Sequence, residues 1–240
     1  MVSKRNVFNW VAVYIVVLGG FWLLSVFGSR AVTAMNQEDI FAGRKCVIID
    51  AGHGGVDGGT TSCTGVTEST LNLEISLRLN DFLHLIGLDT KMIRTTDCSV
   101  YTSGETIAAK KVSDLKERVR IVESTNDSIL VSIHQNYFAQ SVYSGAQVFY
   151  GKNEESHKLA KALQSNLTLV ANPGSKRSAK MADGVYLMER VSCPAILVEC
   201  GFLSNPKEEA LLRSTSYQQM LCCIIGNTLL EFINSSSTIT

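Results

Sequence analysis

The chain alternates short, almost wholly apolar runs with longer segments in which apolar residues recur every three or four positions. The short runs predict strands, and the periodic segments predict amphipathic helices. The predicted strands cover residues 45–50, 88–94, 128–133, 145–150, 185–188 and 195–198. The predicted helices cover residues 69–85, 113–124, 154–170 and 215–233, with another beginning after Asn205-Pro206. This alternation predicts a single α/β domain, in which a mostly parallel twisted sheet has helices on both faces.

A long apolar segment precedes the predicted domain. Residues 7–27 carry no charge and follow Lys4 and Arg5. About 20 apolar residues are enough for a helix to span a bilayer, and a basic flank that stays in the cytoplasm sends the following chain outward. Val32-Thr33-Ala34 also offers small residues at which a signal peptidase cuts. We therefore expect residues 1–34 to be a signal peptide or membrane anchor with the start of a linker, and residues 44–234 to form an exported domain.

The net charge and the spacing of the cysteines argue against some binding partners and against cysteine-based metal or redox sites. Lys4, Arg5 and Arg30 are three of the 22 basic residues, and none of the 22 acidic residues precedes Glu38. The rest of the chain therefore has a net charge of about −3, which predicts no binding of nucleic acid. The seven cysteines include no C-x-x-C pair, so a cysteine zinc site or a redox motif is not supported. Several of them lie in apolar runs, and we predict mostly free structural thiols.

Polar side chains follow three of the predicted strands. The three islands are Asp50-Ala51-Gly52-His53-Gly54-Gly55, Ser132-Ile133-His134-Gln135-Asn136 and Val198-Glu199-Cys200-Gly201-Phe202-Leu203-Ser204-Asn205. Ligands bind at the carboxyl ends of strands in open α/β sheets. His53 and His134 each end a predicted strand, whereas His84 and His157 fall within predicted helices. A catalytic zinc ion takes three protein ligands and keeps a fourth position for water, so we predict a zinc hydrolase site with His53 and His134 as ligands.

Glu68 is the expected third ligand, because it lies at a loop-to-helix junction from which it can fold back over the sheet. A structural role for Glu68 is also open, since an anion is favourable at a helix N-terminus. Glu74 is a competing ligand, but it lies inside the predicted helix. Glu199 is the expected catalytic acid–base, because a carboxylate at the end of an apolar strand is costly to bury without a role. Cys200 is an alternative nucleophile, yet strand alternation points it to the opposite face.

These islands resemble the zinc-dependent N-acetylmuramoyl-L-alanine amidase family, whose members cut the bond between muramic acid and the L-alanine of the stem peptide. Similarity runs from about residue 45 to residue 233. The motifs that carry it are Asp50-Ala51-Gly52-His53-Gly54-Gly55, Gly65-Val66-Thr67-Glu68, Leu115-Lys116-Glu117-Arg118-Val119, Val131-Ser132-Ile133-His134 and the segment 194–205. The resemblance implies that one Zn²⁺ is bound by His53, Glu68 and His134, and that Glu199 is catalytic. It also implies peptidoglycan as the substrate.

The overall plan looks most like the germination-specific amidases of spore formers, which free muramic acid of peptide before a deacetylase forms muramic-δ-lactam in the cortex. That likeness implies a location on the wall or cortex side of the membrane, and a regulatory or deacetylase partner. The chain departs from the family at Ser69, where lysine is usual, and at Thr61-Ser62-Cys63-Thr64, where a small Gly-Ala pattern is commoner. Both departures lie beside Glu68, which raises the hypothesis that zinc is held weakly and depends on a partner or on substrate.

Two other functions remain open from the sequence. A membrane-tethered peptidoglycan-binding protein would keep the fold without catalysis, although all four candidate residues are present. A zinc carboxypeptidase would use the same ligands to release terminal D-alanine. The products of peptidoglycan digestion distinguish these two functions from an amidase.

Overall fold

The computed structural model describes residues 45–237, and it has a six-stranded sheet at its centre. The strands are β1 (Cys46–Ala51), β2 (Thr90–Met92), β3 (Ser128–Asn136), β4 (Gln147–Tyr150), β5 (Lys180–Met181) and β6 (Ala195–Phe202). Their order is β2-β1-β3-β6-β4-β5. The pairs β1–β2, β1–β3, β3–β6 and β4–β5 are parallel, whereas β4 runs antiparallel to β6. The mostly parallel α/β sheet predicted from the sequence is confirmed.

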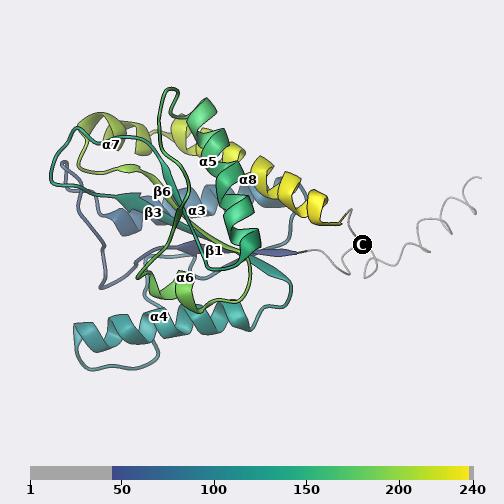
Figure 1. Cartoon of the computed structure of the whole chain (residues 1–240). Coiled ribbons are helices and arrows are strands. Elements are labelled where there is room, and N and C mark those ends of the chain that lie inside the picture. Colours follow the sequence, from purple (N-terminus) through teal and green to yellow (C-terminus); the bar gives the residue numbers. More distant parts are fainter. Residues whose placement is uncertain (1–44, 238–240) are drawn as a thin grey trace, which may run out of the picture. The chain divides into compact units, whose positions relative to one another are not determined.

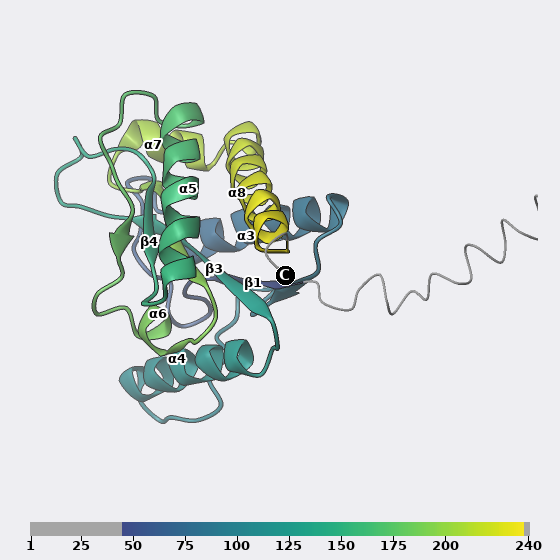
Figure 2. The same cartoon turned by 45° about the vertical axis from the view of Figure 1, so that its right-hand side comes forward.

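Helices cover both faces of the sheet, as Figures 1 and 2 show. The helices are α3 (Glu68–Leu85), α4 (Ile107–Glu123), α5 (Glu154–Val170), α6 (Tyr186–Arg190), α7 (Pro206–Leu212) and α8 (Thr215–Ser237). On one face, Ile49, Val131 and Val198 pack in a core with residues of α3, α5 and α8. On the other face, Ile48 and Leu130 pack with residues of α4 and α6. Successive strand residues thus enter opposite cores, as the alternation of side chains along a strand requires.

Two strands extend further than their apolar runs. β3 continues to Asn136 and β6 continues to Phe202, so His134 and Glu199 lie within strands rather than after them. The two residues are partners in the parallel register of β3 and β6, which then shifts between His134 and Asn136. The polar residues extend the strands because a neighbouring strand satisfies their backbone groups.

The predicted strand at residues 185–188 is wrong. Most of this segment belongs to the short helix α6, which buries Leu187 and Met188 in the core that contains Ile48 and Leu130. β5 lies earlier, at Lys180–Met181, and takes the edge position beside β4. A run of four apolar residues is compatible with a short strand and with a buried helical turn. Here β5 already occupies the edge of the sheet beside β4, and residues 186–190 form a helix.

Helix α4 begins at Ile107, six residues before the predicted start, so it occupies part of a segment expected to be a loop. Thr106 is its N-cap, and its Oγ1 accepts a hydrogen bond from the Ala109 backbone N–H at 3.2 Å. Ser113, the expected cap, instead accepts hydrogen bonds from the N–H groups of Thr102 and Ser103. Two residues able to cap a helix therefore compete in this segment, and tertiary contacts select the earlier one.

The remaining boundaries agree more closely with the pattern. Gly87 follows α3 with a φ of +80°, a conformation that favours glycine at the end of a helix. Asn205 caps α7, since its Oδ1 accepts a hydrogen bond from the Lys207 N–H at 3.0 Å.

The predicted signal peptide or membrane anchor at residues 1–34 lies outside the described residues. No helix within residues 45–237 is both long and apolar enough to cross a membrane.

Candidate metal centre

Three potential metal ligands meet at the carboxyl end of the sheet. His53 lies in the loop after β1, Glu68 is the first residue of α3, and His134 lies on β3. Each offers one ligand atom, and these atoms lie within 4.8 Å of one another. Glu68 Oε1 is 3.2 Å from His53 Nε2 and 3.0 Å from His134 Nδ1. The structure therefore brings together all three ligands proposed from the sequence, with two nitrogen donors and one oxygen donor facing a common point.

Glu199 lies beside this group. It is the register partner of His134 and lines the same cleft as His53 and His134. Its Oε2 is buried and has no hydrogen-bond partner among the described residues. Burial raises the pKa of Glu199 to about 7, and the nearby Glu68 carboxylate adds to the effect, while the two histidines oppose it. A buried carboxyl with an unused oxygen and a pKa near neutrality is suited to take and give a proton.

Two glycines allow the ligands to approach the backbone closely. A Cβ at Gly52 would lie 2.2 Å from His134 Nε2, so any side chain there would collide with the imidazole ring. A Cβ at Gly59 would lie 2.6 Å from Glu68 Oε2 and 2.8 Å from His53 Cδ2. Gly52 and Gly59 therefore leave space for all three candidate ligands.

His53 is held in an unusual backbone conformation. Its φ is +61°, which is uncommon for a residue with a side chain. Its Nδ1 lies 3.0 Å from Asp57 Oδ2, which also pairs with Lys111 Nζ at 3.1 Å. Burial lowers the pKa of His53, but the hydrogen bonds and charges of Glu68 and Asp57 outweigh burial, so the pKa is raised. A carboxylate on one ring nitrogen fixes the imidazole and leaves the other nitrogen free for a metal.

The Glu68 carboxylate is fixed by neighbours on three sides. Thr60 N–H donates to Oε2 at 3.1 Å, while Gln135 N–H donates to Oε1 at 3.2 Å. Asn72 Nδ2 lies 3.4 Å from Oε1 and also donates to the Gly52 carbonyl oxygen at 3.1 Å. Burial opposes ionisation of Glu68, yet the hydrogen bonds to His134 and His53 hold its pKa well below the usual range. Glu68 is therefore ionised, as a metal ligand must be.

A buried ion pair between Asp50 and Arg118 stabilises the first island, residues 50–55. Arg118 of α4 donates hydrogen bonds to Asp50 Oδ1, to the Ala51 carbonyl oxygen at 3.1 Å and to the His53 carbonyl oxygen at 2.7 Å. Ser132 Oγ donates to Asp50 Oδ2 at 2.6 Å. Burial opposes ionisation of Asp50, but the Arg118 charge and the Ser132 hydrogen bond lower its pKa below the ordinary value. These contacts link β1, β3 and α4 next to the cluster of His53, Glu68 and His134.

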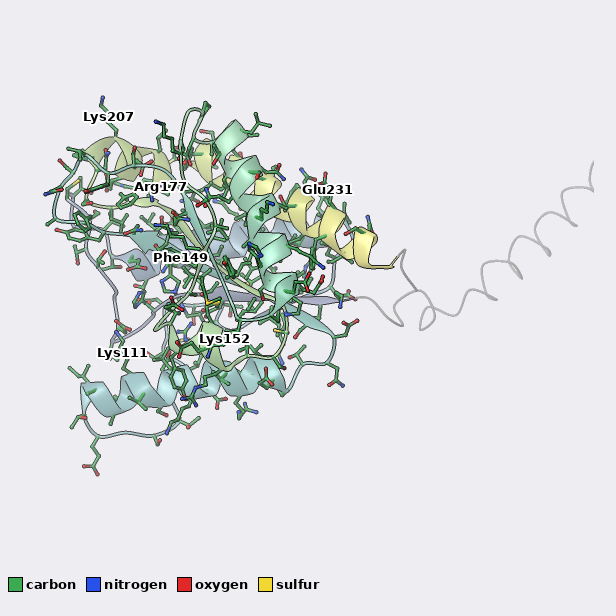
Figure 3. All side chains as sticks on the ribbon, in the orientation of Figure 1. Lys111, Phe149, Lys152, Arg177, Lys207 and Glu231 are labelled. Atoms are coloured by element: carbon green, nitrogen blue, oxygen red, sulfur yellow. The ribbon has the colours of Figure 1, made fainter. Side chains whose placement is uncertain are left out.

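The cluster opens into a cleft of about 350 Å³. Its lining includes charged groups, among them Lys111, which Figure 3 shows on α4. The apolar and aromatic residues of the lining are Leu115, Val185, Tyr186, Leu187 and Leu197. A cleft with an apolar wall and a few convergent polar groups is the usual form of a small-substrate site.

The competing residues lie elsewhere. Glu74 accepts a hydrogen bond from Gln218 Nε2 at 3.1 Å on the side of α8. His84 contacts Thr90, and the His157 ring lies 4.7 Å from the ring of Tyr150. Cys200 packs in the core on the face opposite Glu199, where burial raises its thiol pKa strongly. These positions leave Cys200 without the exposure and low pKa that a nucleophilic thiol needs.

Sequence reasoning assigned no role to Asp50, Asp57 or Arg118. Asp50 follows the apolar run of residues 47–49, and the argument that singled out Glu199, the cost of burying a carboxylate, applies to it as well. No local pattern pairs Arg118 with Asp50, because 68 residues separate them.

All seven cysteines are free thiols in the structure, and three of them are exposed.

Comparison with known proteins identifies the family of the chain. Residues 47–230 match the sequence family described as N-acetylmuramoyl-L-alanine amidase. A germination-specific N-acetylmuramoyl-L-alanine amidase of Bacillus subtilis is 35% identical over 190 residues, covering 78% of this chain and 79% of that protein. The CwlD amidase from Clostridioides difficile, solved in complex with the GerS lipoprotein, is 36% identical with a TM-score of 0.77, covering 80% of this chain and all of that one. An N-acetylmuramoyl-L-alanine amidase from Clostridium difficile 630 is 29% identical with a TM-score of 0.70, covering 80% of this chain and 98% of that one.

Proposed function

The chain belongs to the N-acetylmuramoyl-L-alanine amidase family, and on that premise we propose that its amidase activity on peptidoglycan depends on one zinc ion. The bond cleaved in this proposal joins the lactyl group of muramic acid to L-alanine. The observation that carries the proposal is the convergence of His53, Glu68 and His134 within 4.8 Å, with Glu199 beside them.

The donor set fits zinc. Two imidazole nitrogens and one carboxylate oxygen are the three-ligand pattern of hydrolytic zinc sites, which leaves a position for water. His53 would bind through Nε2, because its Nδ1 is engaged by Asp57. Glu68 is ionised and held by the Thr60 and Gln135 backbone, so its carboxylate is ready to bind without rearrangement.

Glu199 would move the protons of the reaction. A bound zinc ion supplies a Lewis acid that polarises the amide carbonyl and acidifies the attacking water. Glu199 takes the proton of that water and then gives it to the departing nitrogen of L-alanine. Its buried, unpartnered Oε2 and its pKa near neutrality favour both halves of this exchange. The apolar residues that line the cleft would lower the polarity around a bound amide, which would strengthen these polar interactions.

We further propose that this activity serves the spore cortex and that the chain is exported. The support is the germination-specific relative from Bacillus subtilis and the uncharged segment of residues 7–27, which suits a signal peptide or membrane anchor. In this role the chain removes stem peptides before a deacetylase forms muramic-δ-lactam. The complex of the CwlD amidase with a lipoprotein supports a regulatory protein partner for this chain as well.

Digestion of purified peptidoglycan tests the reaction. The expected products are free stem peptides with N-terminal alanine, formed with zinc and absent after chelation. Glu199→Gln should bind zinc but lose at least about 100-fold in turnover, because general acid–base catalysis contributes about 10²–10⁴-fold. Unchanged peptidoglycan would indicate a binding protein, and released D-alanine would indicate a carboxypeptidase.

A complementation assay tests the cortex role. A spore former that lacks its own cortex amidase should regain muramic-δ-lactam when it expresses this chain, but not when it expresses Glu199→Gln. Failure of the active wild-type chain to restore the lactam would contradict the cortex role and leave the amidase activity standing.

A further inference from the structure

We propose that Glu209, on α7, is a positioning residue for the metal ligand Glu68. It acts through the segment of residues 58–67, here called the Glu68 loop. The inference rests on the proposed zinc site, and it concerns how firmly this chain holds one of its ligands. Two of the residues that depart from the family pattern, Ser62 and Thr64, contact Glu209.

The Glu68 loop touches its ligand directly. Glu68 N–H donates to the Thr60 carbonyl oxygen at 2.8 Å, and Thr60 N–H donates back to Glu68 Oε2 at 3.1 Å. Ser69 N–H donates to the Gly58 carbonyl oxygen at 3.1 Å, and Thr61 bridges to Thr67. A shift of the loop would therefore remove a hydrogen bond from the carboxylate and move the start of α3.

Ser62 is the buried residue among positions 59–65, and it joins the loop to the rest of the domain. Its Oγ accepts hydrogen bonds from the N–H groups of Thr64 and Val66 at 3.3 and 3.0 Å. The same hydroxyl donates to Glu209 Oε1 at 3.2 Å, and Thr64 Oγ1 donates to that oxygen at 2.5 Å. One carboxylate oxygen thus accepts hydrogen bonds from two of the loop's hydroxyls, those of Ser62 and Thr64.

Glu209 is well placed for this role. It is 3% exposed, whereas Lys207 on the same helix projects from the surface (Figure 3). A buried carboxylate requires partners, and its cationic neighbour, Arg213, is half-exposed at 3.4 Å. The buried Ser62 hydroxyl and the Thr64 hydroxyl are therefore its other partners. Because α7 follows β6 directly, Glu209 ties the Glu68 loop to the element that carries Glu199.

Loss of this contact should weaken zinc binding more than it weakens the fold. Removing a group that orients a metal ligand typically costs about 10–100-fold in metal affinity. Glu209→Ala leaves Ser62 and Thr64 without their acceptor, which frees the loop and its hydrogen bond to Glu68. Glu209→Gln keeps an oxygen that accepts from both hydroxyls, so it should retain most of the affinity.

The experiment measures three quantities on the full chain as wild type, Glu209→Ala, Glu209→Gln and Thr64→Val. They are the zinc dissociation constant by competition with a chromophoric chelator, hydrogen exchange of residues 58–67 without metal, and the urea midpoint of unfolding. Glu208→Ala is the matched control: Glu208 is the adjacent buried carboxylate, but it accepts from the Gly145 and Phe202 N–H groups at 2.8 Å. It should lower the urea midpoint without changing zinc affinity by more than about twofold.

The expected result is a rise of about 10-fold or more in the zinc dissociation constant for Glu209→Ala, faster exchange in the Glu68 loop and near-recovery with Glu209→Gln. An affinity within about twofold of wild type would overturn the inference while the zinc amidase proposal stands. If Glu209→Ala does not fold, Thr64→Val decides, since it removes one exposed hydroxyl: unchanged affinity and unchanged exchange overturn the inference. A wild-type chain that binds no zinc would overturn both proposals.

Discussion

Arg118 donates a hydrogen bond to the carbonyl oxygen of His53, 2.7 Å away, and so holds a residue whose φ is +61°. The same guanidinium pairs with the buried Asp50 carboxylate and with Asp114. A non-glycine residue in the left-handed region costs free energy that the surrounding contacts must offset. Arg118 thus links α4 to the backbone geometry of His53, the first candidate metal ligand.

Arg118→Met should destabilise the domain by about 3–5 kcal/mol, because it leaves Asp50 buried without its cation. The measurement is the free energy of unfolding in urea. Arg120→Met is the matched control, since Arg120 lies on the same helix but is exposed and pairs with Glu117. It should leave the unfolding midpoint unchanged. Equal effects of the two substitutions would show that the Asp50–Arg118 pair contributes no more than a surface pair.

The dependence of stability on pH should show that Asp50 is ionised in the folded protein. Burial raises its pKa, but Arg118 and Ser132 outweigh burial and lower the folded-state pKa. Its contribution to stability is therefore fully present above the unfolded pKa of about 3.9 and is lost as pH falls through the lower folded pKa. The difference in unfolding free energy between wild type and Asp50→Asn should shrink from about pH 6 to about pH 3. A constant difference across that range would contradict this assignment.

Gly52→Ala should displace His134 and reduce zinc affinity by about 10–100-fold. The added Cβ would lie 2.2 Å from His134 Nε2, inside any allowed contact. Gly58→Ala provides the control, because its Cβ would lie 3.5 Å from the Thr67 methyl, an ordinary contact. Chelator competition should show normal zinc binding for Gly58→Ala. Normal binding by Gly52→Ala as well would mean that the His134 ring is free to move away.

Zinc should stabilise the wild-type domain against heat. At a zinc concentration 100 times the dissociation constant the gain is about 2.7 kcal/mol, or about 5–10 °C in melting temperature for a domain of this size. His134→Ala should show no zinc-dependent shift in a thermal melt. His157→Ala should keep the shift, because His157 packs on Tyr150 outside the cluster. A shift that survives in His134→Ala would indicate a different metal site.

The sequence alone predicted that the candidate residues would cluster, because three of the four follow apolar runs. In an open parallel sheet the strand ends share one edge, so placing His53, His134 and Glu199 after predicted strands was enough to bring them together. The same reasoning selected Glu68 over Glu74, which the structure places against α8. The order of elements and the core faces were also predictable, since the period of apolar residues is a local property.

Only the tertiary structure decided what supports those residues and how the short elements fold. Arg118 reaches Asp50, and Glu209 reaches Ser62, across 68 and 147 residues, distances over which no local pattern specifies a partner. The segment at residues 185–188 became α6 because β5 already occupies the edge of the sheet. Local periodicity determines which face of an element is buried. Pairing between distant side chains depends instead on where packed backbones place them, and at this site the packing sets the geometry of the candidate ligands.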